Sequence, residues 1–143
     1  MTKISKTLAE LQEFDKQAFI YLTRNGFLEN GKVTNKVGKL ASSITNVLNQ
    51  YSKHAEVING EMKEEVELLR INNCLEDEKT KEVLTDDKGN YKFSKQGLIK
   101  LNNEIKVVRD RVKETKVEIH QRIIETSEEL TDTEREIFKD LVI

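Results

Sequence analysis

The sequence predicts a mainly α-helical protein, in which a long amphipathic helix packs with a second long helix and with short helices. A small β-hairpin and a short strand complete the predicted fold. Two observations lead to this class. The 143 residues include no proline, which favours long uninterrupted helices. Apolar residues also recur at steps of three and four along most of the chain, the spacing of one helix face. The length is that of a single domain spanning 1–143.

The first predicted helix begins after Thr7. Thr7 and Glu10 have the spacing of a capping box, in which each side chain binds the other residue's backbone N–H. Gly26 allows the left-handed conformation that ends a helix. The expected apolar face comprises Leu8, Leu11, Phe14, Ala18, Phe19 and Leu22.

The second predicted helix is the longest, and Thr34 is placed to cap it. Its apolar stripe comprises Val33, Val37, Leu40, Ile44, Val47, Tyr51, Ala55, Ile58, Met62, Val66 and Leu69. An unbroken helix of about 40 residues is about 60 Å long, so either Gly60 interrupts it or another chain covers part of it. Because a helical glycine costs only about 1 kcal/mol against alanine, we expect one helix with a weak point at Gly60.

The next elements are a hairpin and a third helix. Two β-prone runs, 82–85 and 91–94, flank the turn-forming residues 86–90, which predicts a hairpin. Ser94 is placed to cap the helix that follows. Its packing seam has a heptad spacing and comprises Leu98, Leu101, Ile105, Val108 and Val112.

The last part of the chain predicts a strand and a short helix. Apolar β-branched residues alternate over 117–120, which is typical of a strand. Thr131 and Glu134 form a second capping box, and a short helix follows. The apolar end, 141–143, is expected to pack on the core or on a partner.

Composition excludes several classes of function. The chain has 24 basic and 26 acidic residues, a net charge of −2, so we expect no coating of DNA. We expect no membrane span, because no apolar stretch reaches about 18 residues. The single cysteine, Cys74, cannot form an internal disulfide, which fits the cytoplasm. Motifs for metal ions, nucleotide phosphates and catalytic serines are missing. We therefore predict no enzyme, metal ion or cofactor.

Two groups of residues are candidates for binding a ligand. Lys106, Arg109 and Lys113 share one face of the third helix, and cations at this spacing can hold phosphates. The alternative is a solvated face paired with nearby acids.

Tyr91 and Phe93 form the second group, because they share one face of the predicted strand beside Asn90. Two rings could stack on a purine while the amide binds its edge. The alternative is that both rings pack the hairpin onto the long helix. If the rings and the cations meet, they form a nucleotide pocket.

The run from Leu84 to Ser94, LTDDKGNYKFS, precedes a Leu/Ile-rich helix, a Val-Glu-Ile strand and a C-terminal segment that starts at Leu130. This pattern, over about 35–143, resembles small uncharacterised proteins of tailed bacteriophages. The order of long helix, hairpin and basic helix also distantly resembles phage anti-defence nucleotide-sponge proteins. That resemblance implies a helical oligomer that sequesters an immune signal, such as a cyclic nucleotide or an ADP-ribose derivative, in the host cytoplasm.

The thin core and the long helix themselves predict a homo-oligomer, because a lone copy would leave an apolar stripe in water. Two other functions fit such a protein. It is either a virion structural or assembly protein, or an inhibitor that binds a host protein directly.

Overall fold

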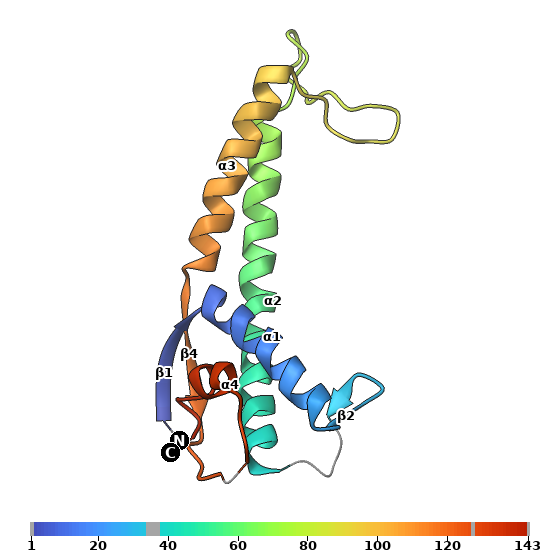
Figure 1. The fold of residues 1–143 in the computed structure, drawn as a ribbon. Helices are drawn as coiled ribbons and strands as arrows, with labels where there is room; N and C mark the ends of the chain where they lie inside the picture. The colour runs from blue at the N-terminus through green and yellow to red at the C-terminus, as the bar shows by residue number, and fades with distance from the viewer. Residues whose placement is uncertain (1, 34–37, 127, 143) are drawn as a thin grey trace. The chain divides into compact units, whose positions relative to one another are not determined.

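The computed structural model describes residues 2–33, 38–126 and 128–142. Its elements are β1 (Thr2–Thr7), α1 (Leu8–Arg24), β2 (Leu28–Glu29), β3 (Lys32–Val33), α2 (Lys39–Asn73), α3 (Lys95–Lys113), β4 (Lys116–Gln121) and α4 (Asp132–Ile137) (Figure 1). The mainly helical class is confirmed, with a long helix packed on a second long helix. In the part of the chain that is described, no helix is long and apolar enough to cross a membrane.

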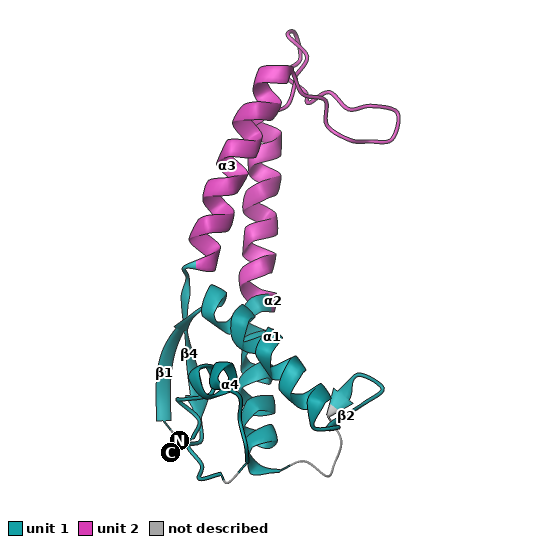
Figure 2. Ribbon diagram, viewed as in Figure 1, with its two compact units in different colours: residues 1–55, 114–143 teal, residues 56–113 magenta. Residues whose placement is uncertain are grey.

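The chain forms two compact units, which Figure 2 colours separately. Unit 1 comprises residues 1–55 and 114–143, and unit 2 comprises residues 56–113. The division falls within α2.

A two-stranded antiparallel sheet in unit 1 joins the N-terminal segment to residues 116–121. β1 pairs with β4, so that Ile4 lies opposite Ile119. Burial alternates along β4, which confirms the predicted strand and places Val117, Ile119 and Gln121 on its inner face. Its partner β1 was not among the predicted elements.

Helix α1 begins and ends where the sequence indicates. Thr7 and Glu10 form the capping box, and Gly26 has a positive φ of 69°. The prediction that Phe19 belongs to the buried face was wrong, since its side chain is 62% exposed. Phe19 lies about 100° round the helix from the buried Ala18 and so points away from the core. Tyr21 is the aromatic residue of α1 that is buried in its place.

The C-terminal segment completes the core of unit 1. The capping box of Thr131 and Glu134 is present at α4, and Leu141 is buried as expected. The fully buried ring of Phe138 packs edge-on against Phe14 and Tyr21, at centroid distances of 5.4 and 5.6 Å. Ile143 lies outside the described residues.

Helix α2 is continuous for 35 residues through Gly60, which confirms the preferred prediction. The assignment of Val33 to this helix was wrong, because β3 contains it. It pairs there with Leu28 in a hairpin closed by two residues with positive φ. The predicted cap at Thr34 and the stripe residue Val37 lie outside the described residues.

In unit 2, α3 runs alongside the C-terminal half of α2 (Figure 1). Ser94 caps α3 as predicted, and its Oγ accepts a hydrogen bond from the Gly97 N–H at 2.9 Å. A Cβ on Gly97 would lie 2.8 Å from the carbonyl oxygen of Asn73, so the two helices approach closely at this level. Two seam residues, Leu101 and Val108, are buried.

The connection between α2 and α3 contains the turn of the predicted hairpin. Asp86 accepts hydrogen bonds from the N–H groups of Lys88 and Asn90, and Thr85 forms an isolated antiparallel bridge with Tyr91. Three backbone hydrogen bonds connect three residues of this segment in a cycle. The Leu75 N–H donates to the Lys92 carbonyl oxygen, the Lys92 N–H donates to that of Leu84, and the Leu84 N–H donates to that of Leu75. The runs around the turn therefore pair only at isolated bridges and form no extended strands.

Candidate functional site

The three predicted cations all lie exposed on α3. Lys106, Arg109 and Lys113 share one face, and none forms an ion pair with a described residue. Their neighbour Arg111 is different, because its guanidinium binds the Glu65 carboxylate of α2.

The aromatic candidates lie in the connection. Tyr91 and Phe93 are half-buried, and Asn90 is exposed in the turn. The Tyr91 hydroxyl donates a 2.6 Å hydrogen bond to Glu67 of α2, which raises the Tyr91 pKa. For Tyr91, this contact supports the alternative in which the ring packs on the long helix.

Among the described residues, no hydrogen bond, ion pair or cation–π contact joins the aromatic group to the cations. At 100° per residue, Glu67 lies about 170° round α2 from the side that faces α3. The Tyr91 hydroxyl is therefore held on the far side of α2, away from Arg109. Two cavities in unit 1 are lined by none of the six candidate residues.

One cavity, of about 160 Å³, lies between the β1–β4 sheet, α1 and α4. Its apolar wall includes Ile4, Phe14, Val47 and Ile119. This volume is close to that of an engineered apolar cavity that binds benzene, and it is well below the range typical of ligand pockets.

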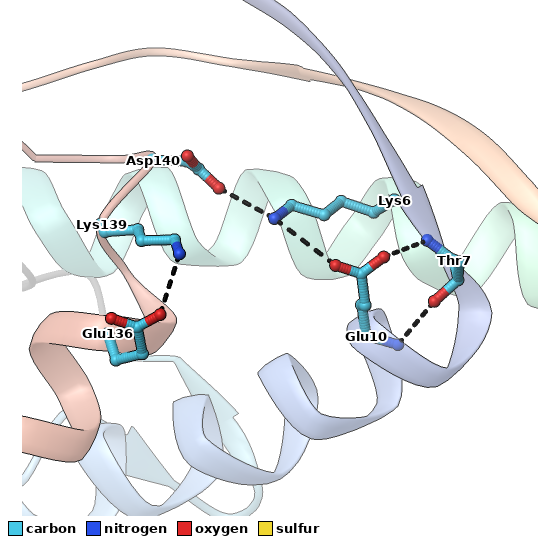
Figure 3. A network of polar contacts seen from close by, with 6 residues as sticks. All are labelled: Lys6, Thr7, Glu10, Glu136, Lys139 and Asp140. Atoms are coloured by element: carbon cyan, nitrogen blue, oxygen red, sulfur yellow. Dashed lines mark hydrogen bonds and ion pairs between the residues drawn. The ribbon is translucent and has the colours of Figure 1, made fainter.

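Charged residues that line this cavity bind one another (Figure 3). The Lys6 ammonium lies 2.9 Å from the Asp140 carboxylate and 3.9 Å from Glu10. The Thr7 N–H donates to the Glu10 carboxylate and lowers its pKa. These contacts link β1 and α1 to the C-terminal segment.

A second pair of charged residues lines the same cavity. Lys139 donates a 2.8 Å hydrogen bond to Glu136, which raises the lysine pKa (Figure 3). Because these charges are bound to each other, the geometry favours a structural role, in which the contacts hold neighbouring segments together, over a ligand site.

A larger cavity, of about 750 Å³, lies at the first turns of α2. Lys39 contributes a cation from α2, and Arg122 contributes another from the segment after β4. Ser43 holds the two segments together, because its hydroxyl donates to the Arg122 carbonyl oxygen at 3.2 Å. Glu125 also lines the cavity and contributes one carboxylate. The N-terminal end of a helix adds positive potential, so two cations and this potential outweigh the single negative charge and favour an anion.

Sequence reasoning missed Lys39 and Arg122. Both residues are exposed and 83 positions apart in the chain, and neither belongs to a motif. The pairing of β1 with β4, which sets the course of the chain after Gln121, left no signal in the sequence around them.

The two histidines line neither of these cavities. His54 Nε2 lies 3.0 Å from the Glu118 carbonyl oxygen, and His120 is exposed on β4. Among the described residues, no cluster of three His, Cys, Asp or Glu side chains is arranged to hold a metal ion. Comparison with protein-family models, curated proteins and solved structures found no match for this chain.

Proposed function

We propose that this protein is a non-enzymatic binding protein that works as a homo-oligomer, with its association surface on unit 2. One observation carries the proposal. Unit 2 buries two side chains among its residues, Leu101 and Val108, whereas nine large apolar side chains stay exposed. They are Val57, Leu68, Ile71, Leu75, Val83, Leu84, Leu98, Ile99 and Val107.

Exposed apolar area is unfavourable in water by about 25 cal/mol per Å². A pair of helices can bury only the seam between them, so side chains on the outer faces need a further surface. Large exposed apolar patches on soluble proteins usually mark interaction sites. A second copy supplies such a surface wherever the first copy is present.

Sedimentation equilibrium at micromolar concentration tests self-association. We expect a mass that is a multiple of 16.6 kDa and that decreases on dilution. A well-folded species of 16.6 kDa across the micromolar range would overturn the proposal.

The resemblance to phage anti-defence proteins adds a ligand class to this proposal. In this extension the oligomer sequesters a nucleotide signal. The support is the cavity at the start of α2, because its volume of about 750 Å³ lies within the range of small-molecule pockets. Lys39 and Arg122 would bind the phosphates, and the arginine could do so bidentately.

Titration calorimetry with cyclic nucleotides and ADP-ribose derivatives tests the ligand. We expect heat of binding for the unmodified protein and a loss of affinity of about tenfold or more in Arg122→Ala. Arg135→Ala, an exposed change on α4 outside the cavity, should bind normally. If no compound in either class gives heat, the extension fails. Mass spectrometry of phage particles and pull-down from host lysate then distinguish the virion and host-inhibitor alternatives.

A further inference from the structure

The two helices of unit 2 carry opposite charge. Residues 56–73 of α2 contain five acidic and two basic side chains, whereas α3 contains six basic and two acidic ones. Within the described residues, one ion pair joins the two helices, between Arg111 and Glu65. Two others each lie within one helix, one in α2 and one in α3. Most of this complementary charge is therefore not used between the two helices of one copy.

Two of the unused acidic side chains of α2 belong to a regular exposed stripe. Glu61 and Glu64 are exposed and form no ion pair with a described residue. Val57 precedes them by four residues, and Leu68 and Ile71 follow at steps of four and three, with exposures of 62%, 60% and 41%. This acidic stripe, residues 57, 61, 64, 68 and 71, has the heptad spacing of a helix-packing face.

A matching stripe runs along α3. Ile99, Asn102, Lys106, Arg109 and Lys113 follow one another at steps of three, four, three and four, and all five are exposed. We call this the basic stripe. Each stripe has an isoleucine at the end near the connection and charged side chains farther along, and the acidic stripe ends in the apolar Val57.

Three of the five pairs of stripe positions match in antiparallel register, whereas Leu68 lies level with Asn102 and Val57 lies level with Lys113. Gly97 lies level with Asn73, as their close approach shows. Counted from this level, Glu64 of α2 and Lys106 of α3 are each nine residues away along their own helix. Glu61 and Arg109 are each twelve residues away. Two residues from it are Ile71 and Ile99. Each helix rises by about 1.5 Å per residue, so these pairs lie at equal heights.

The stripes cannot meet within one copy. At 100° per residue, the acidic stripe lies about 110° from the seam in one rotational sense, and the basic stripe lies about 110° from it in the opposite sense. Because α2 and α3 are antiparallel, the two stripes emerge on opposite sides of the helix pair. A copy therefore offers an acidic stripe on one side and a basic stripe on the other.

We propose that a second copy of this chain is the partner of unit 2, and that the acidic stripe of α2 in one copy docks on the basic stripe of α3 in the next. The contact is heterologous, with different surfaces on the two copies. A rotation axis parallel to the helices keeps every residue at its own height, so it sets Glu61 beside Arg109 and Glu64 beside Lys106 of the next copy. This inference rests on the proposed self-association and names its surfaces.

Charge reversal with complementation tests the pairing. The first variant, Lys106→Glu with Arg109→Glu, makes both stripes acidic, and the second, Glu61→Lys with Glu64→Lys, makes both basic. We expect each variant alone to associate at least about tenfold more weakly than the unmodified chain, because like charges then face each other. An equimolar mixture should regain association, since every contact between unlike copies is again complementary.

The controls separate this inference from the proposed function. Lys16→Glu with Lys88→Glu makes the same charge change at exposed positions outside the stripes, and it should associate normally. Circular dichroism checks that each variant keeps its helices. If the unmodified chain is monomeric, both the function and this inference fail. If the chain associates and the reversed variants associate equally well, or their mixture shows no recovery, the function stands and the pairing of these stripes is overturned.

Discussion

Units 1 and 2 both contain amphipathic helices, but they differ in how many of the apolar side chains of those helices are buried. Unit 1 holds fourteen of the sixteen buried apolar residues of the described chain, and unit 2 holds two. The large exposed apolar residues show the reverse distribution, with three in unit 1 and nine in unit 2. A sheet and several helices can surround a common centre, whereas two helices share only one line of contact.

Helix α2 shows the difference within one element. Its stripe has the same spacing throughout, yet Leu40, Ile44 and Val47 are buried while Ile58 and Met62 are only half-buried. Hydrophobic spacing therefore indicates which face of a helix is apolar, and the number of surrounding elements decides how much of that face is covered.

The largest expected effect is the loss of a ring at the centre of unit 1. Phe138→Ala removes a side chain with no exposed area and should lower the free energy of unfolding by about 3–5 kcal/mol. Phe19→Ala, at a 62% exposed position, should change it by less than about 0.5 kcal/mol. Urea denaturation followed by circular dichroism measures both, and equal costs would contradict the packing of this core.

The buried carboxylate of unit 1 should give a smaller, pH-dependent effect. Burial disfavours the charged form of Glu134, but hydrogen bonds from Arg24 and the Thr131 N–H outweigh it and lower the pKa. Because the pKa is lower in the folded state, this stabilisation is present above the unfolded value and is lost as pH falls through the folded value. Glu134→Gln should cost about 2 kcal/mol at neutral pH.

Denaturation over a range of pH measures this effect. The difference between the variant and the unmodified chain should shrink as pH falls below 4.5, the ordinary value for a glutamate. A difference that stays constant down to pH 2 would show that the charge of Glu134 contributes nothing.

Gly97 provides the corresponding test in unit 2. In Gly97→Ala, the new methyl group would lie 2.8 Å from a backbone oxygen of Asn73, and backbone atoms of two packed helices cannot move apart cheaply. We expect a cost of about 1–2 kcal/mol. Hydrogen exchange of the amides of α3 localises the effect, and unchanged protection there would contradict the close approach of α2 and α3.

The smallest expected effect has the opposite sign. Gly60 lies inside α2, and a Cβ built on it meets nothing within 4 Å. Gly60→Ala should therefore raise stability by about 0.5–1 kcal/mol through helix propensity. Thermal denaturation measures the gain, and a loss of stability would show that α2 needs a flexible point at this position.

Local chemistry made much of this fold predictable. Thr7 with Glu10, and Thr131 with Glu134, define helix starts by a reciprocal hydrogen bond within four residues, and both are present. The three-and-four spacing of α2 and the Ser94 cap of α3 are equally local. Each depends on neighbours in the sequence, so a single chain suffices to recognise them.

Contacts between distant segments were not predictable in this way. The strand β1 exists because it pairs with β4, which starts more than 100 residues later, and neither run identifies the other. The cavity of Lys39 and Arg122, and the side of α2 on which Tyr91 is held, depend on the same long-range folding.

The sequence by itself determined the four helices, the N-terminal caps of α1, α3 and α4, and the opposite charges of residues 56–73 and α3, because these follow from residue types and their spacing along one chain. Only the tertiary structure decided that unit 1 encloses a core while unit 2 leaves its outer stripes uncovered. Burial depends on how many elements surround a face, and that number is a property of the folded chain.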